Sequence, residues 1–373
     1  MKSLAVLICF GVSWAGIASA QTPADAAMQA AARLENAGVS LDAASGRSDR
    51  VAALTETVQA YEAGLAALRD GLRRAAIRQR TLEVDLNARS DEVARLLGVL
   101  QTMGRAPAPL LLLHPSGPTG TARSGMMLAD VTPALQAQVE DLRLQVEEVA
   151  VLRDLQNDAL EILKDGLEGV QRARAELSRA IADRTDLPVR FADDPVMTAV
   201  LLASAETLEA FASGLVETED QSQGSGPDAS ALKGDIPLPV AGQILRRFQE
   251  TDAAGIARPG VLIATRPRAL VTTPVSATIR YAGPLLDYGN VVILEPAVDT
   301  LWVIAGMAEV FGQVGQIVPD GTPIGLMGGN TGDVQAILME SAQGSAGNQS
   351  ETLYLEVRDR QSAVDPATWF AFE

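Results

Sequence analysis

A repeating pattern of apolar residues in the first half of the chain constrains its fold most. From Val51 to Met103, apolar side chains recur alternately every three and four residues, with Gln79 and Arg89 as polar exceptions. The apolar positions are Val51, Leu54, Val58, Tyr61, Leu65, Leu68, Leu72, Ala75, Leu82, Leu86, Val93, Leu96, Leu100 and Met103. This heptad repeat predicts a helix that buries one seam against another helix. At a rise of about 1.5 Å per residue, the helix would be about 80 Å long.

A second heptad pattern follows a break that is rich in proline and glycine, residues that interrupt a helix. Its apolar positions are Leu135, Val139, Leu142, Val146, Val149, Leu160, Leu163, Leu167, Val170, Leu177 and Ile181, with polar exceptions at Arg153, Gln156 and Arg174. Two rods of similar length predict an antiparallel coiled-coil hairpin over residues 21–190, with a tip at about 104–130. A long parallel dimer is the alternative, and the central position of the break favours the hairpin.

The N-terminal residues 1–20 have the pattern of a Sec-type signal peptide. A basic Lys2 and an apolar stretch precede an expected cleavage site between Ala20 and Gln21. We therefore expect export to the periplasm. Cys9, the only cysteine, lies inside this signal, which excludes disulfides and thiol catalysis in the mature chain. The formal net charge of −17 argues against binding to nucleic acid.

The part of the chain after the coiled region divides into three expected segments. Residues 191–220 contain an amphipathic helix from about Asp194 to Thr218, which is either a packing helix or a movable lid. The Gly- and Ser-rich residues 221–235 are expected to form a linker. Residues 236–373 change to a period of two with frequent turns, which predicts a small all-β domain. Its expected strands include Thr272–Ile279, Gly289–Leu294, Leu301–Ile304 and Leu353–Val357. The fold class is therefore α + β multidomain.

Several motifs in the β-domain resemble the LytM, or lysostaphin-like, metallopeptidase domain. They lie in the order found in that family and comprise IPLPVAG at 236–242, GVLIA at 260–264, YAG at 281–283, YGNVVI at 288–293, VGQIV at 314–318 and LYLEVR at 353–358. The resemblance implies that active members hold zinc with a His and an Asp of one motif and a His of a late His-x-His pair. A catalytic zinc needs three such ligands and an open position for water.

Carried over one at a time, these positions fall on residues that do not suit zinc. The first His corresponds to Arg258 and the Asp to Leu262, while the middle-strand His corresponds to Ile304. The late pair corresponds to Thr352 and Tyr354. Leu and Ile offer no donor atom, Thr and Tyr are poor zinc ligands, and Arg brings positive charge. We therefore expect no zinc, no other cofactor and no catalysis.

Other catalytic arrangements find no support in the sequence. His114, the only histidine, lies in the expected tip, where a solvated or locally hydrogen-bonded residue is a better interpretation than a ligand or pH switch. The absence of a mature cysteine and of a histidine in the β-domain excludes Cys-His and Ser-His-Asp machinery. The Gly-rich residues 328–332 are expected to form a turn rather than a phosphate loop.

The same substitutions predict an apolar groove suited to a protein partner, with Leu262, Ile304, Thr352 and Tyr354 on its floor. The complete layout resembles the EnvC-like murein hydrolase activators. That resemblance implies a groove that binds and activates an N-acetylmuramoyl-L-alanine amidase, a hairpin that docks on the membrane complex FtsEX, and a helix that blocks the groove until FtsEX releases it. Peptidoglycan remains open as a further partner. By motif match, the groove residues are Leu262, Tyr288, Tyr354, Arg358 and Arg258.

Two alternatives remain, an active LytM-type zinc endopeptidase with unusual ligands and a periplasmic adaptor of an export system. Adaptors generally build their β-domain from strands on both sides of the hairpin, whereas residues 21–50 show a weak helical pattern and no strand pattern. Residues 333–350 are longer and more polar than the family's connection before the last strand, and we expect a loop near the groove there.

Overall fold

The computed structural model describes residues 23–89, 94–95, 98, 117–184, 187–190, 195–205, 207–217, 227–251, 255–330, 337 and 351–372. Its helices are α1 (Pro23–Ala43), α2 (Arg47–Ala88), α4 (Gly117–Ala182), α5 (Pro195–Ser204) and α6 (Leu208–Glu217). Within these ranges, no helix combines the length and the apolar composition that crossing a membrane requires. The expected signal peptide and His114 lie outside the described residues.

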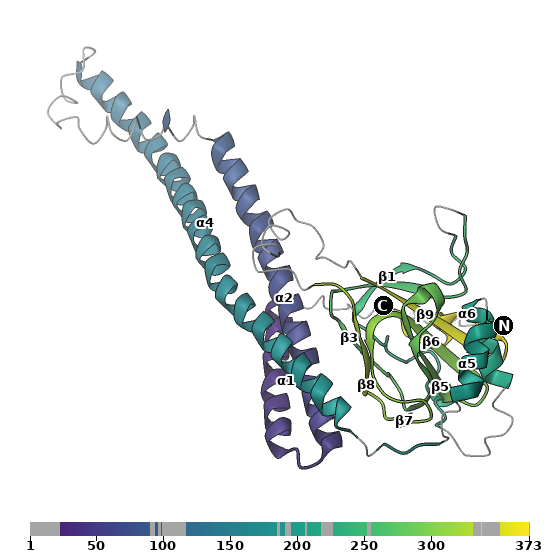
Figure 1. Ribbon diagram of the computed structural model, residues 1–373. Helices are drawn as coiled ribbons and strands as arrows, with labels where there is room; N and C mark the ends of the chain where they lie inside the picture. Colours follow the sequence, from purple (N-terminus) through teal and green to yellow (C-terminus); the bar gives the residue numbers. More distant parts are fainter. Residues whose placement is uncertain are drawn as a thin grey trace, which may run out of the picture.

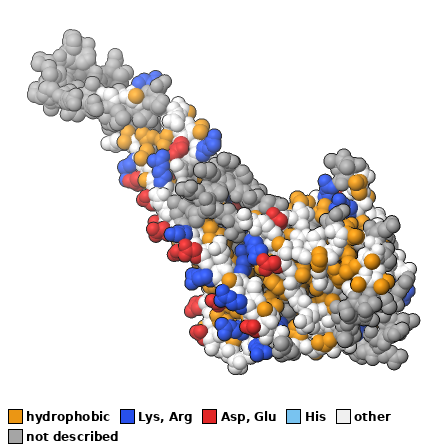
Figure 2. Space-filling model, in the orientation of Figure 1, with side chains coloured by type: hydrophobic (Ala, Val, Ile, Leu, Met, Phe, Trp, Pro, Cys, Tyr) orange, Lys and Arg blue, Asp and Glu red, His pale blue; other side chains and the backbone are white. Residues whose placement is uncertain are grey.

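Helices α2 and α4 lie side by side and run in opposite directions (Figure 1). Glu62 near the start of α2 pairs with Arg174 near the end of α4, whereas Arg78 pairs with Glu148 farther along. In the space-filling view, acidic and basic side chains are intermixed along this helical half (Figure 2). The full-length coiled coil with its tip stays a prediction, because residues 99–116 are not described. Helix α4 already begins at Gly117, so the expected tip range is helical from there onward.

Polar exceptions in the two heptad patterns form contacts between α2 and α4. Gln156 Nε2 donates a hydrogen bond to Gln79 Oε1 at 3.0 Å, which joins an exception of one pattern to an exception of the other. Arg153 likewise reaches across to Glu83 on α2, at 2.9 Å. A partly buried polar pair in an apolar seam favours one register, because a shift would separate its two hydrogen-bonding groups.

The entry segment forms a third helix that packs on α2. Ala30 and Ala37 of α1 are buried. Small residues allow this close approach, since a Cβ atom placed on Gly64 would lie 3.6 Å from the Cβ of Ala30. The weak helical pattern expected for residues 21–50 therefore corresponds to an ordered helix and the start of α2.

The C-terminal half is a single antiparallel sheet, which confirms the predicted all-β domain. Its strands are β1 (Gly242–Arg246), β2 (Val261–Thr265), β3 (Leu270–Thr272), β4 (Ala277–Pro284), β5 (Asn290–Ala297), β6 (Thr300–Val310), β7 (Ile317–Val318), β8 (Pro323–Met327), β9 (Glu351–Asp359) and β10 (Ser362–Val364). The main order is β1-β2-β9-β6-β5-β4-β7, while β8 pairs with both β3 and β6 and β10 pairs with β9. Short 3₁₀ turns are η3 (Ser230–Leu232), η4 (Leu286–Tyr288) and η5 (Pro366–Thr368).

The central strands are buried on both faces, which explains their continuous apolar sequences. Along β6, Trp302 and Ile304 point into the main core, whereas Leu301 and Val303 point to the opposite face. Trp302 packs edge-on against Trp369, with ring centroids 5.6 Å apart. Strands β3 and β8 complete the main core from its other side through apolar residues that include Val271, Ile324 and Met327.

The base of the helical half packs against the outer side of β3 and β8. Leu270 and Leu326 join an apolar cluster with residues of α2 and α4. Within this interface, Glu62 Oε1 accepts hydrogen bonds from Arg174 at 2.7 Å and from the Leu270 backbone N–H at 3.2 Å. Burial raises the pKa of Glu62, and the Arg174 guanidinium opposes that rise. Arg174 therefore interrupts the heptad pattern where the helices meet the sheet.

Two expected boundaries differ from the structure. The strand expected over Thr272–Ile279 is divided into β3 and β4, because Pro274 lacks a backbone N–H and the chain turns there. The linker expected over 221–235 packs on the β-domain from Pro227 onward. There Ala229 is buried and its backbone N–H donates to the carbonyl of Pro296 at 3.0 Å.

Candidate functional site

Two short helices, α5 and α6, replace the single helix expected from Asp194 to Thr218. Helix α5 ends at Ser204, and α6 begins at Leu208. The side chain of Thr207 caps α6, since its Oγ1 accepts a hydrogen bond from the backbone N–H of Ala210 at 3.1 Å. Thr207 thus marks the start of a separate helix after the end of α5.

Helix α6 covers one face of the sheet, on the side of the β-domain away from α2 and α4 (Figure 1). We call the sheet residues beneath it the groove face, and they are Tyr281, Leu285, Val291, Ile293, Leu301, Val303, Ala305 and Tyr354. The helix contributes Leu208, Phe211, Ala212 and Leu215. Phe211 is fully buried and packs edge-on against Tyr281, with ring centroids 4.8 Å apart.

The structure brings three of the predicted groove residues together. Leu262 on β2 lies directly opposite Tyr354 on β9. The ring of Tyr288, at the end of η4, lies 6.0 Å from the ring of Tyr354. Gly260 leaves room for the Tyr354 ring, since a Cβ at this position would lie 2.5 Å from a ring atom. Leu262 and Tyr288 are partly buried against the cluster that holds α6.

Two of the five residues at predicted ligand positions, Ile304 and Thr352, do not form part of a buried groove floor. Ile304 lies in the main core on the opposite side of the sheet, because side chains alternate along β6. Its neighbour Ala305 instead lies on the groove face, directly opposite Tyr354. Thr352 is exposed. It lies two residues before Tyr354 on β9, so the alternation of side chains along the strand places both on the same side of the sheet. The assignment of Ile304 to the groove is therefore wrong.

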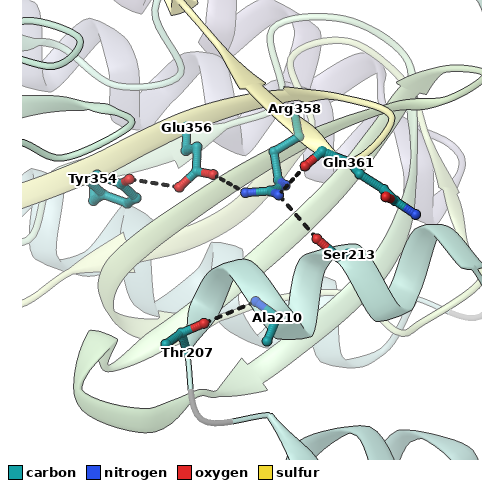
Figure 3. A network of polar contacts seen from close by, with 7 residues as sticks. All are labelled: Thr207, Ala210, Ser213, Tyr354, Glu356, Arg358 and Gln361. Carbon is teal, nitrogen blue, oxygen red and sulfur yellow. Dashed lines mark hydrogen bonds and ion pairs between the residues drawn. The ribbon is translucent and has the colours of Figure 1, made fainter.

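A chain of polar contacts connects Tyr354 to helix α6 (Figure 3). The hydroxyl of Tyr354 donates to Glu356 Oε2 at 2.7 Å, and Arg358 Nη1 donates to Glu356 Oε1 at 2.7 Å. Arg358 Nη2 donates to Ser213 Oγ on α6 at 3.1 Å and to the carbonyl of Gln361 at 2.7 Å. Arg358 has no exposed surface, so this predicted groove residue lies beneath α6.

The surroundings of Tyr354 in this set of polar contacts keep its hydroxyl protonated. Burial, followed by the charge of Glu356, raises the pKa of Tyr354 far above its ordinary value. Tyr354 thus remains a hydrogen-bond donor to the carboxylate. Arg258 is exposed and lies near enough for its positive charge to oppose this rise in the pKa of Tyr354. Arg258 therefore lies at the margin of the groove face rather than within it.

A second buried ion cluster lies under the C-terminal end of α6. Glu295 on β5 accepts from Arg190 Nη1 at 2.6 Å and from Arg280 Nη1 at 3.2 Å. Arg280 Nη2 also donates to the backbone carbonyl of Leu215 in α6, at 3.1 Å. Neither this cluster nor Glu356 was predicted from the sequence. Glu356 was recognisable, because residues 354, 356 and 358 share one side of a strand.

The residues at the predicted ligand positions do not fit a catalytic zinc. Leu262 offers no donor atom, the hydroxyl of Tyr354 is engaged with Glu356, and Arg258 adds positive charge nearby. In the part of the chain that the structure describes, no group of three or more His, Cys, Asp or Glu side chains is placed to hold a metal ion. The groove face instead combines apolar side chains with buried, paired charges, which suits binding of a helix.

The β-domain matches a known family. Residues 257–366 fit the model of peptidase family M23. This region is a LytM-type M23 domain. The chain is 27% identical over 146 residues to the uncharacterized protein NMB1333 of Neisseria meningitidis serogroup B, a match that covers 39% of this chain and 22% of that protein. The chain therefore spans well under two thirds of that relative.

Solved structures with similarity to part of this chain include two bacterial proteins. Helicobacter pylori Csd3 is 18% identical with a TM-score of 0.28, and the match covers 37% of this chain and 35% of that chain. A zinc-containing peptidase from Vibrio cholerae is 19% identical with a TM-score of 0.28, and the match covers 37% of this chain and 41% of that chain.

Removal of the N-cap of α6 should loosen its first turn. Thr207→Ala is expected to destabilise the helix by about 1 kcal/mol, because the N–H of Ala210 loses its side-chain acceptor. Hydrogen exchange of residues 208–211 measures the effect and should become several times faster. Thr207→Ser keeps the hydroxyl and serves as the control. Equal exchange in the alanine and serine variants would contradict the capping role.

Proposed function

We propose that the protein is a non-catalytic, exported activator of an N-acetylmuramoyl-L-alanine amidase. In this proposal the amidase binds the groove face of the M23 domain, and α6 covers that face until it is displaced. One observation carries the proposal. The apolar side of α6, with Phe211 at its centre, packs on the groove face, which includes Tyr354 and adjoins Leu262 at former ligand positions.

The short length of α6 suits a helix that a partner can displace from the groove face. It has 10 residues, and a helix of this length is marginally stable without packing against the sheet. Each fully buried Leu or Phe contributes about 1.5–3 kcal/mol of hydrophobic stabilisation. A partner helix with the same i, i+3, i+4, i+7 apolar spacing would bury equivalent area and compete directly for the groove face.

The helical half provides a route for control from the membrane. We propose that α2 and α4 dock on FtsEX in the periplasm and transmit its motion to the M23 domain, which they contact at β3 and β8. Peptidoglycan remains a further candidate ligand. The adaptor alternative is less well supported, because Pro23–Ala43 ahead of the hairpin is helical and supplies no strand to the sheet.

The test is a dye-release assay on labelled peptidoglycan with the mature chain and a purified amidase of the same organism. The amidase alone should act slowly and the chain alone should release no dye, while the mixture should release dye several times faster than the amidase. Two results would contradict the proposal. One is release by the chain alone that a chelator abolishes and zinc restores, which would favour the endopeptidase. The other is failure to stimulate any of the organism's periplasmic amidases.

A further inference from the structure

The contact between the helical half and the M23 domain combines apolar packing with hydrogen bonds. We call this contact the helix–sheet joint, and its apolar part is Leu270 of β3 and Leu326 of β8 packed against residues of α2 and α4. Burial of apolar surface holds the two halves together, but the hydrophobic effect is non-directional. A single orientation of the helices on the sheet therefore depends strongly on the directional contacts of the joint.

Glu62 supplies such a contact, because one of its oxygens joins three elements. Glu62 Oε1 on α2 accepts from Arg174 Nη2 on α4 at 2.7 Å and from the backbone N–H of Leu270 on β3 at 3.2 Å. The side chain of Glu62 is 20% exposed and that of Arg174 is 9% exposed, so water competes little for these bonds. A hydrogen bond needs its donor nearly in line with its acceptor. Rotation of the helices over β3 would therefore break the bond to Leu270.

Strand β3 presents this backbone donor to the helices. Among the described strands it pairs with β8, and the N–H of Met327 on that side donates to the carbonyl of Ala269 at 2.9 Å. The carbonyl of Ala269 and the N–H of Leu270 belong to one trans peptide unit and point in opposite directions, so this N–H points away from β8. A buried N–H without an acceptor is costly. Glu62 thus provides the acceptor that a neighbouring strand provides elsewhere in the sheet.

A cleft beside the joint gives the helices room to rotate. It has a volume of about 590 Å³ and lies between α4, which contributes Gln171 and Ser178, and the M23 domain, which contributes Arg268 and Asn330. Arg174, the partner of Glu62, also lines it. Close packing resists motion of one element over another, and an open cleft does not. The joint is thus held at Glu62 and open beside it.

We propose that Glu62 sets the orientation of the helical half on the M23 domain, and that loss of its bond to Leu270 lets the helices rotate about the apolar part of the joint. The apolar contact keeps the two halves attached in either case. A displacement of α2 and α4 would then reach the sheet at β3. The inference rests on the proposed function only in treating the helical half as the part that receives a signal.

Distance measurements between two spin labels test this orienting role in the mature chain. The only native cysteine lies in the expected signal peptide, so engineered cysteines are labelled specifically. Asp165→Cys on α4 and Val298→Cys in the M23 domain place the labels at exposed positions. In Glu62→Ala, the distance distribution should broaden, and the Leu270 amide should exchange about tenfold faster or more, because it loses a bond to a charged acceptor. An unchanged distribution would overturn the proposal, even if Leu270 exchanged faster.

Glu83→Ala is the matched control for these measurements. Glu83 also lies on α2 and accepts from an arginine of α4, Arg153, at 2.9 Å. Its described contacts lie within the two helices. The label distances and the exchange of Leu270 should therefore stay as in the parent chain. Equal broadening in the Glu83 and Glu62 variants would assign the effect to the hairpin and contradict the proposal.

A double variant separates the joint from the stability of the hairpin. Glu62→Ala leaves the buried guanidinium of Arg174 without its carboxylate, which can loosen α2 and α4 themselves. Adding Arg174→Leu removes that charge. The distance distribution should be broad in the single and the double variant, while residues 78–85 of α2 keep their exchange protection in the double variant. A narrow distribution in the double variant would refute the role of Glu62.

Amidase stimulation by the same variants is measured separately. A broadened distribution with unchanged stimulation would keep the orienting role of Glu62 and remove the helical half from the proposed control of the amidase. Failure of the parent chain to stimulate any amidase would contradict the proposed function and leave the distance result intact.

Discussion

Phe211→Ala is expected to release α6 from the groove face and raise amidase stimulation. The side chain has no exposed surface and packs edge-on against Tyr281, so truncation removes both hydrophobic burial and an aromatic contact. Buried Phe→Ala substitutions lose about 3–5 kcal/mol. Such a loss shifts the docking equilibrium of α6 by about a hundredfold or more. A partner then binds without first displacing the helix, which raises its apparent affinity.

Two measurements on the same variant separate docking from function. Hydrogen exchange of residues 208–217 reports release of α6, and the dye-release assay reports amidase stimulation. Val200→Ala is the matched control, because Val200 lies on α5 and is 56% exposed. Both readouts should change in Phe211→Ala and neither in Val200→Ala. Fast exchange with unchanged stimulation would mean that α6 does not cover the partner site.

Arg358→Ala is expected to destabilise the whole M23 domain. Removal of the guanidinium deprives the buried carboxylate of Glu356 of its Arg358 ion pair, while the hydroxyl of Tyr354 still donates to it (Figure 3). Breaking a buried ion pair in this way costs about 3–5 kcal/mol, which corresponds to a fall in Tm of roughly 10 °C. Lysine in place of Arg358 should recover part of the loss, because it keeps the charge and lacks the planar fork.

Tryptophan fluorescence provides a domain-specific readout for this prediction. Outside the expected signal peptide, the tryptophans are Trp302 and Trp369, and both lie in the core of the M23 domain. Arg360→Ala is the control, because Arg360 is two residues farther along the chain and its side chain is 78% exposed. An exposed pair of this type contributes little to stability. Equal Tm values for the two variants would show that the Arg358 network does not stabilise the domain.

The sequence predicted the types of secondary structure more reliably than their limits. Heptad spacing indicated long helices, and alternation indicated strands, because each period reflects the geometry of one element alone. The ends of elements, such as the start of α6 at its Thr207 cap and the break between β3 and β4 at Pro274, depend on single residues within otherwise continuous patterns. The error at Ile304 arose from motif alignment, which ignored the side of β6 on which this residue lies.

The candidate site was predictable where it followed strand alternation and unpredictable where it joined distant segments. Tyr354 and Arg358 belong to one motif, and their common side of β9 could be deduced together with that of Glu356. No local pattern linked Ser213 to Arg358, which are 145 residues apart. The groove residues and a possible lid helix at about Asp194–Thr218 were thus predicted separately, whereas the contact between Ser213 and Arg358 was not predicted.

The sequence by itself determined that this chain combines long helices with an M23-like β-domain whose ligand positions are unfit for zinc, because residue type and period are local properties. Only the tertiary structure decided that α6 lies on the groove face and that Arg190, Glu295 and Arg280 meet beneath its end. The contacts among Arg190, Glu295, Arg280 and α6 join residues up to 105 positions apart, and the contact between Ser213 and Arg358 joins residues 145 positions apart. They depend on how separate elements pack and where buried charges find partners, which no single stretch of sequence specifies.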